Sequence, residues 1–248
     1  MPTSATSSCA VLNYFVETHL KKSILALCAL TLAASLAACG GGTSKYTIGG
    51  TVTNLQYGPL VLVTNGMEVA IQPQTDSSGK LVMTTNYTFP NQLEYGEAYN
   101  VTLKPIGTDA TGATIYQQPP HQVCGPANVQ GNITSDTAGR LSVINPQFVC
   151  NLATHTIGGQ ITGLAADNLV LTNGGDQLAL TKNETTGLYP TSFTFSTRVT
   201  YKTTYGVTVL TQPTGQTCTV TNGAGEMGDE DIAAIRINCT TNPAPAPT

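Results

Sequence analysis

The second half of the sequence repeats the first, and this repeat limits the fold more than any other feature. The segment Tyr46-Thr-Ile-Gly-Gly returns as His155-Thr-Ile-Gly-Gly, and other segments recur in the same order. These begin at Leu60, Tyr95 and Gln118 in the first copy and at Leu169, Tyr201 and Gln212 in the second. A period of about 100 residues is typical of a duplicated domain rather than a solenoid. We therefore expect two similar domains, residues 46–151 and 152–240.

Within each copy the hydrophobic residues alternate with a period of two. Tyr205, Val207 and Val209 alternate with Gly206 and Thr208, which places one set of side chains in a core and the other in water. Thr, Val, Tyr and Ile, which favour β-strands, dominate these segments. No segment after residue 38 shows a sustained helical stripe. The pattern predicts an all-β chain with about seven short strands in each copy, as in a β-sandwich.

Glycines mark turns and close contacts in this pattern. Asn65-Gly66 and Asn173-Gly174 are predicted to form hairpin turns, because both residue types accept a positive φ at low cost. The pairs Gly49-Gly50 and Gly158-Gly159 stand near the start of each copy. We interpret them as bulges or as positions of close packing.

An export signal precedes the repeat. Lys21-Lys22 is followed by about sixteen apolar or small residues that end in Leu36-Ala-Ala-Cys39, which is typical of a signal peptide rather than a transmembrane helix. This box resembles that of bacterial lipoproteins. The resemblance implies that residues 1–38 are cleaved, that Cys39 is lipidated, and that the lipid anchors the chain to a membrane. An ordinary secretory signal with an incidental Cys39 is the alternative. A start near Val16 or Leu20 would leave a more compact leader.

The flanks of the repeat are interpreted as unstructured. Residues 39–45 form a Gly-rich tether after the lipidated cysteine, and residues 241–248 form a disordered Pro/Ala tail. In the lipoproteins that this chain resembles, a residue such as Gly40 in place of aspartate directs the protein to the outer membrane. The resemblance therefore implies a lipid-anchored protein of the cell envelope, on the periplasmic or the surface face.

Four of the seven cysteines remain after the signal and Cys39 are set aside. An even number of thiols in an oxidising compartment predicts disulfides. Three pairings are open to four cysteines, and the repeat selects one of them if each copy folds alone. The predicted bonds, which join the last two strands of each copy, are Cys124–Cys150 and Cys218–Cys239.

The segment from Tyr205 to Gly225, continued at Asn238-Cys239, resembles an immunoglobulin-like repeat of bacterial surface lipoproteins and secreted proteins. Its Tyr-x-Val-x-Val and Gln-Pro-x-Gly-Gln-x-Cys motifs are complete in the second copy. The first copy departs from them, since His121 stands where the family has Gly. The resemblance implies two tandem immunoglobulin-like β-sandwich domains and an envelope location, but no reaction.

The first copy contains about a dozen extra residues, 104–115, before its Gln-Pro step. An insertion in a loop is a common place for a specific contact. We therefore take Lys104, Ile106, Asp109 and Ile115 as the candidate contact residues for a protein or glycan partner.

Composition narrows the classes of function. The net charge of −4 and a charged fraction of 10% leave no basic surface for nucleic acid. His121 and His155 are the two histidines beyond the signal, and we expect structural roles for both. Asp229-Glu230-Asp231 could bind calcium, but it lacks the alternating spacing of a calcium loop, so a solvated loop is the preferred interpretation. We expect no cofactor, no metal and no catalytic residue.

The predicted function is a non-enzymatic, membrane-anchored envelope or surface lipoprotein that acts as a binding or structural module. The alternative is a hydrolase of envelope polymers. Such an enzyme would need two carboxylates facing each other across a cleft, with Glu94, Glu97 and Glu230 as the candidates.

Overall fold

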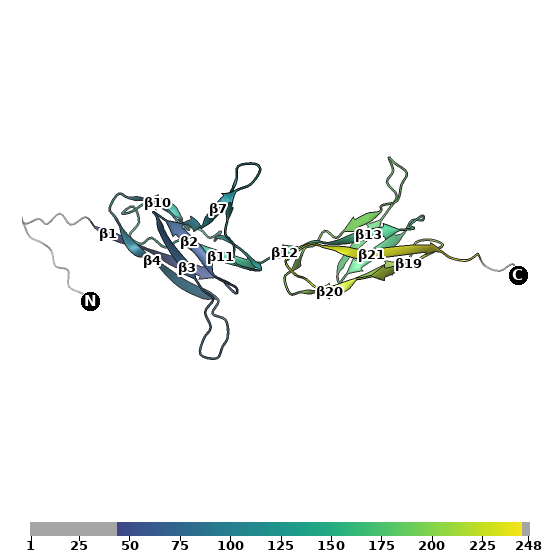
Figure 1. Cartoon of the computed structure of the whole chain (residues 1–248), viewed down its shortest axis with the longest axis horizontal. Coiled ribbons are helices and arrows are strands. Elements are labelled where there is room, and N and C mark those ends of the chain that lie inside the picture. Colours follow the sequence, from purple (N-terminus) through teal and green to yellow (C-terminus); the bar gives the residue numbers. More distant parts are fainter. Residues whose placement is uncertain (1–43, 245–248) are drawn as a thin grey trace, which may run out of the picture. The chain divides into compact units, whose positions relative to one another are not determined.

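The computed structural model describes residues 44–244. The proposed signal peptide, Cys39 and residues 245–248 lie outside the described residues. Every regular element in this part of the chain is a β-strand, as Figure 1 shows, and the strands build two sandwiches, each around its own hydrophobic core. The all-β prediction is therefore confirmed. Between residues 44 and 244 no helix is present that could cross a membrane.

The first sandwich has one sheet of order β4-β1-β11-β9 and a second of order β3-β2-β6, with β10 paired to β5 and β7 to β8. Its strands are β1 (Lys45–Thr53), β2 (Leu60–Thr64), β3 (Met67–Ile71), β4 (Thr84–Glu94), β5 (Ala98–Asn100), β6 (Thr102–Leu103), β7 (Pro105–Thr108), β8 (Thr114–Tyr116), β9 (Gln122–Pro126), β10 (Ser135–Thr137) and β11 (Gln147–Leu152).

The second sandwich has sheets of order β16-β13-β21-β19 and β15-β14-β18-β20, with β12 paired to β17. Its strands are β12 (Thr154–His155), β13 (Ile157–Thr162), β14 (Leu169–Asn173), β15 (Asp176–Leu180), β16 (Ser192–Thr194), β17 (Val199–Thr200), β18 (Thr204–Thr211), β19 (Gln216–Thr221), β20 (Ala224–Glu226) and β21 (Ile232–Thr241). More strands are present than the seven expected, because single residues such as Val101, Lys104 and Thr156 divide continuous runs and the insertion adds β7 and β8.

The two sandwiches share one topology. The first long strand of each copy pairs in parallel with its last long strand, β1 with β11 and β13 with β21. In both copies the last long strand also pairs antiparallel with the strand before the short β10 or β20. This common arrangement is that of two tandem immunoglobulin-like β-sandwiches, as the resemblance implies.

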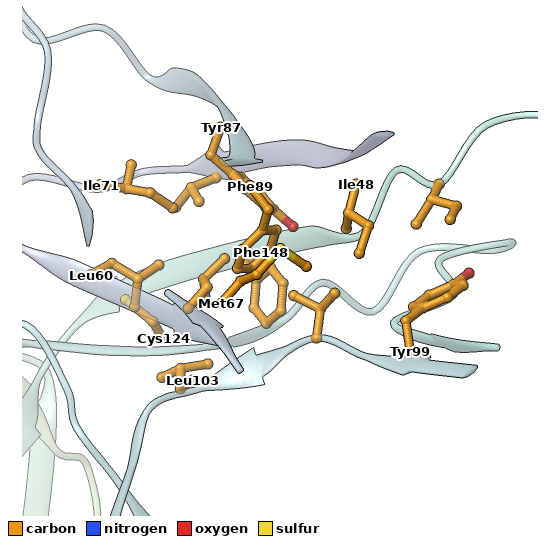
Figure 2. Packing of buried hydrophobic residues seen from close by; sticks show 14 of the residues in the cluster. Ile48, Leu60, Met67, Ile71, Tyr87, Phe89, Tyr99, Leu103, Cys124 and Phe148 are labelled. Carbon is orange, nitrogen blue, oxygen red and sulfur yellow. The ribbon is translucent and has the colours of Figure 1, made fainter. Parts of the chain in front are cut away.

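Apolar side chains from both sheets fill each core. In the first, Ile48 of β1, Leu60 of β2 and Phe148 of β11 are fully buried, and Figure 2 shows them among the other side chains of the cluster. Tyr87 packs edge-on against Phe89 with ring centres 5.9 Å apart, while its hydroxyl donates a hydrogen bond to Pro146 O at 2.9 Å. Burial raises the pKa of the Tyr87 phenol.

The two glycine pairs are close-packing positions, as predicted. A Cβ at Gly50 would lie 1.9 Å from Pro146 O, and one at Gly159 would lie 2.2 Å from Ile235 O. Both neighbours are main-chain atoms of the segment packed against the first strand of the copy. The register of β1 on β4 also shifts between Thr47 and Gly49, which confirms a bulge there.

One predicted hairpin turn is correct and the other is displaced by one residue. Asn65 and Gly66 have φ of 47° and 71° and connect β2 to β3. In the second copy Asn173 pairs with Asp176, so the central residues of the turn are Gly174 and Gly175. In the second copy Gly175 provides an additional turn residue, and the Asn173 side chain accepts a hydrogen bond from the Gly206 amide.

Both predicted disulfides are present and confirm the pairing of Cys124 with Cys150 and of Cys218 with Cys239. In each copy the two cysteines lie directly opposite each other on neighbouring antiparallel strands. The expectation that these are the last two strands of each copy is wrong in one respect. A short strand, β10 or β20, lies between them in the chain and pairs with a strand outside their sheet.

Candidate functional site

The extra segment of the first copy folds into a two-stranded hairpin, β7–β8, that projects from the sandwich (Figure 1). Its base is closed by a hydrogen bond from the Gln117 amide to Lys104 O at 2.8 Å. In the second copy β18 continues to Thr211 and is followed directly by Gln212, so the hairpin belongs to the first sandwich alone. The insertion is therefore an ordered element rather than an irregular loop.

The four candidate contact residues divide into two classes. The Lys104 ammonium lies 2.8 Å from Glu68 Oε2, and the Asp109 carboxylate accepts hydrogen bonds from Thr111 and the Ala113 amide. Those bonds, that of the Thr111 hydroxyl above all, hold the pKa of the Asp109 carboxyl below its ordinary value. Both charged residues thus stabilise the base and the tip of the hairpin, while Ile106 and Ile115 are exposed.

Exposed apolar side chains occupy neighbouring positions on the two paired strands of the hairpin. Ile106 is 62% exposed and is the extra residue of a bulge opposite Ile115, which is 43% exposed. Tyr116 pairs with Pro105 near the base and is 39% exposed. Three large apolar side chains are therefore exposed on one short projecting ribbon.

A groove of about 220 Å³ lies beside the base of this hairpin, where β6 and β9 form edges of the two sheets. Tyr116 and Gln118 line one part of it, and the core residues Leu103 and Phe148 are among its other lining residues. Because Tyr116 belongs to both the hairpin and the groove, the two form one continuous surface. We call them together the hairpin surface.

A second group of polar side chains, outside the hairpin surface, surrounds His121. The ring of His121 stacks on Tyr201 with centres 4.1 Å apart and planes 7° apart, and Tyr57 contacts both rings edge-on. His121 Nδ1 lies 2.7 Å from a carboxylate oxygen of Asp229. We call Tyr57, His121, Tyr201 and Asp229 the junction cluster, after the Ala153 link between β11 and β12, whose main chain bonds both His121 and Tyr201.

The acidic segment at residues 229–231 is engaged by histidines rather than arranged around an ion. Asp229 contacts His121, while Asp231 lies 3.6 Å from His155 and accepts a hydrogen bond from the Thr156 amide. That amide bond is the main reason why the pKa of the Asp231 carboxyl lies below its ordinary value. Within residues 44–244 no group of His, Cys, Asp and Glu is arranged to hold a metal ion.

Of the carboxylates considered for hydrolysis, Glu94 ends strand β4, and Glu97 and Glu230 lie in connections between strands. Glu97 Oε2 accepts a hydrogen bond from the Glu94 amide at 2.7 Å, which closes the turn between β4 and β5. Glu230 belongs to the connection between β20 and β21 of the other sandwich. The Glu97 carboxylate thus has a structural role in the described fold.

Sequence reasoning did not identify the roles of several residues of the repeat. Gln122 and Gln216 are buried glutamines that bond the main chain of the loop after the first strand of each copy. Each of these glutamines stands two positions before the first cysteine of its copy, and this recurrence could have indicated their shared role. Tyr95 and Tyr201 occupy equivalent positions in the repeat, but Tyr95 is 68% exposed and Tyr201 lies in the junction cluster.

No protein family and no curated protein matches the sequence. Among solved structures, a major pilin protein (T-13) from Streptococcus pyogenes is similar over 81% of this chain and 98% of the pilin, with 13% identity and a TM-score of 0.22. A second major pilin protein (T3.2) from the same species is similar over 82% and 99%, with 12% identity and a TM-score of 0.19. These values are low, and the likeness assigns no function to this chain.

Proposed function

We propose that this chain is a lipoprotein of the bacterial cell envelope that is anchored by its lipid to the outer membrane. There it acts as a non-enzymatic binding or structural module. The hairpin surface is its contact site for a protein or glycan. The observation that carries the proposal is the exposure of Ile106 and Ile115 on an element that the second copy lacks. The Leu36-Ala-Ala-Cys39 box supports the anchor.

The hairpin is suited to recognition because the sandwich holds it without depending on it. Its base is closed by a main-chain bond and the Lys104–Glu68 ion pair, and its tip by Asp109. A ribbon held in this way loses little conformational freedom when a partner binds. A partner strand could add to its free edge by main-chain hydrogen bonds, while the two isoleucines provide apolar contact.

The contact site is tested with soluble residues 44–248 in a binding screen against envelope fractions and glycans. The double variant Ile106→Ser/Ile115→Ser removes the apolar contact and leaves Asp109 and the turn intact. We expect binding to fall at least tenfold, since two buried isoleucine contacts are lost. The matched control is Val143→Ser, which changes another residue of the first sandwich that is 68% exposed.

Equal binding by the double variant and the control would contradict the assignment of the hairpin surface. Failure of the folded, oxidised wild-type protein to bind any fraction would instead favour a purely structural spacer. The anchor is tested separately with Cys39→Ala in cells. We expect this variant to lose lipid labelling and to leave the membrane fraction, whereas an ordinary secretory signal predicts no change.

A further inference from the structure

The end of the first sandwich at which β1 begins carries two tyrosines in contact. The rings of Tyr46 and Tyr95 have centres 6.5 Å apart and are tilted by 45°. Tyr95 is 68% exposed, yet one side of its ring packs on Gly139, where an added Cβ would overlap the ring. Tyr46 is replaced by His155 in the second copy, so this tyrosine pair belongs to the first copy alone.

Main-chain bonds hold this end of the sandwich together. The Tyr95 amide donates a hydrogen bond to Ser44 O at 2.9 Å, and the Gly96 amide donates one to Ala138 O at 2.9 Å. The turn after β4 is therefore bound both to the residue before β1 and to the segment after β10. Tyr95 thus projects from an ordered part of the fold that lies directly beside the start of β1.

Charged groups of both signs surround the two tyrosines. Lys45 lies opposite Glu94 in the register of β1 and β4, and Glu97 accepts a hydrogen bond from the Glu94 amide. Arg140, whose side chain is 73% exposed, lies 3.1 Å from the mostly buried Asp136. Exposed cations and carboxylates are thus balanced, which suits a zwitterionic partner better than an anionic one. We name as the proximal surface the residues Lys45, Tyr46, Glu94, Tyr95, Glu97 and Arg140.

The length of chain before β1 limits what this surface can meet. Five residue steps separate Cys39 from Ser44, and they span about 18 Å at most when fully extended. The proposed function, on which this inference rests, places a lipid on Cys39. The headgroup layer of a bilayer is about 6 Å deep on each side. The proximal surface therefore stays within reach of the headgroups.

We propose that the proximal surface lies on the zwitterionic headgroups of the membrane to which the chain is anchored. Tyrosine has an apolar ring and a polar hydroxyl, and it is enriched where membranes meet water. Lys45 and Arg140 pair with headgroup phosphates, while Glu94 and Glu97 face the ammonium groups. The short chain keeps the effective concentration of the surface at about 1 mM or above, so a weak contact is enough.

The test attaches the mature chain, residues 39–248, to vesicles chemically, so that it needs no lipidation in cells. The other four cysteines of this segment form disulfides, so a maleimide lipid couples to Cys39 alone. The chain has no tryptophan, and Tyr95→Trp therefore introduces a single fluorescent reporter that keeps an aromatic ring. The vesicles are phosphatidylcholine with a fraction of lipid that carries a nitroxide quencher on its headgroup.

The matched control is Val123→Trp, at the opposite end of the same sandwich. Val123 is 58% exposed and pairs with Asn151, two residues beyond the partner of Thr53, the last residue of β1. The nine residues of β1 separate the two ends by about 26 Å. We expect the nitroxide to quench Tyr95→Trp about twofold more strongly than Val123→Trp, because interfacial aromatic rings lie at headgroup level. Equal quenching of both reporters would overturn the proposal.

A longer tether distinguishes contact with the membrane from mere closeness to it. Insertion of roughly ten Gly/Ser residues after Gly42 lets the sandwich move away from the vesicle. We expect the difference between the two reporters to decrease but to persist, because the proximal surface still binds headgroups. If the difference disappears, the short chain alone kept this end near the membrane, and the proposal is wrong.

Two further comparisons identify what covers the surface. Quenching of Tyr95→Trp should not change when fewer molecules are coupled to each vesicle, whereas a loss on dilution would assign the surface to a second copy of the chain. Anionic phosphatidylglycerol should not increase the quenching, and a marked increase would contradict a zwitterionic partner. Failure of the Cys39→Ala test in cells would contradict the anchor but not these measurements, so the two failures are distinguishable.

Discussion

At the scale of single residues, buried glutamines connect each disulfide strand to the loop after the first strand of its copy. Gln122 Oε1 accepts bonds from the Gln56 and Tyr57 amides, and its Nε2 donates to Asn54 O. Gln216 does the same with the Ala165 amide and Gly163 O. A buried side chain that satisfies several main-chain groups is costly to remove, because those groups lose their partners.

Gln122→Ala is therefore expected to lower the free energy of unfolding of the first sandwich by about 2 kcal/mol. Urea denaturation provides the measurement. The control is Val123→Ala, the next residue in the strand, which is 58% exposed and should change stability by less than about 0.5 kcal/mol. Equal effects of the two substitutions would show that Gln122 has no such role.

The requirement for glycine at position 159 is a second feature at the scale of single residues. A Cβ there would overlap Ile235 O, an atom that the main chain of β21 cannot move freely. We expect Gly159→Ala to destabilise the second sandwich by about 2–3 kcal/mol. Gly206→Ala is the matched control in strand β18, because nothing lies within 4 Å of the added Cβ. Thermal unfolding that ranks the two variants the other way would contradict the close-packing role.

At the scale of elements, the β7–β8 hairpin is an addition to a sandwich that is complete without it. Its strands pair only with each other among the described residues, and all of its residues are exposed. An isolated two-stranded hairpin is marginally stable in water, so this element depends on its base. The hairpin therefore needs the sandwich for its stability, whereas the sandwich does not need the hairpin.

Replacing residues 105–116 with Asn-Gly would join Lys104 to Gln117 through a two-residue turn, in keeping with the existing main-chain bond between them. We expect the stability of the first sandwich to change by less than about 1 kcal/mol, as measured by urea denaturation, with the Cys124–Cys150 bond intact. A large loss of stability would mean that the hairpin is part of the fold. The shortened protein should also lose binding in the screen described above.

At the scale of the whole molecule, the two sandwiches have separate cores and separate disulfides. Two cores in one chain commonly unfold in two steps. Removing one disulfide should therefore affect one step, because the stabilisation from a crosslink comes mainly from its own closed loop.

The double variant Cys218→Ser/Cys239→Ser is expected to lower the unfolding free energy of the second sandwich by about 3 kcal/mol and to leave the first nearly unchanged. Calorimetry should show one transition moved and one retained. The reciprocal variant, Cys124→Ser/Cys150→Ser, should move the other transition. A single transition that moves as a whole in both variants would show that the cores unfold together.

The sequence by itself determined the fold class, the disulfide pairing and the close-packed glycines. Each of these follows from local pattern and from repetition, because two copies of one pattern must satisfy the same packing constraints. The equivalence of Cys124 with Cys218 could therefore be inferred from the sequence. So was the place of the insertion at residues 104–115, although not its folding into a hairpin.

The tertiary structure alone decided which side chains meet. His121 and Asp229 are 108 residues apart, and nothing in the local pattern of either segment indicates the other. Gly174 and Gly175 form the turn in place of Asn173-Gly174, and the Asn173 side chain accepts a hydrogen bond from Gly206 of β18. Contacts of this kind depend on how separate elements pack, whereas alternation and turn chemistry depend on neighbours along the chain. For this reason the fold could be derived from the sequence, while the junction cluster could not.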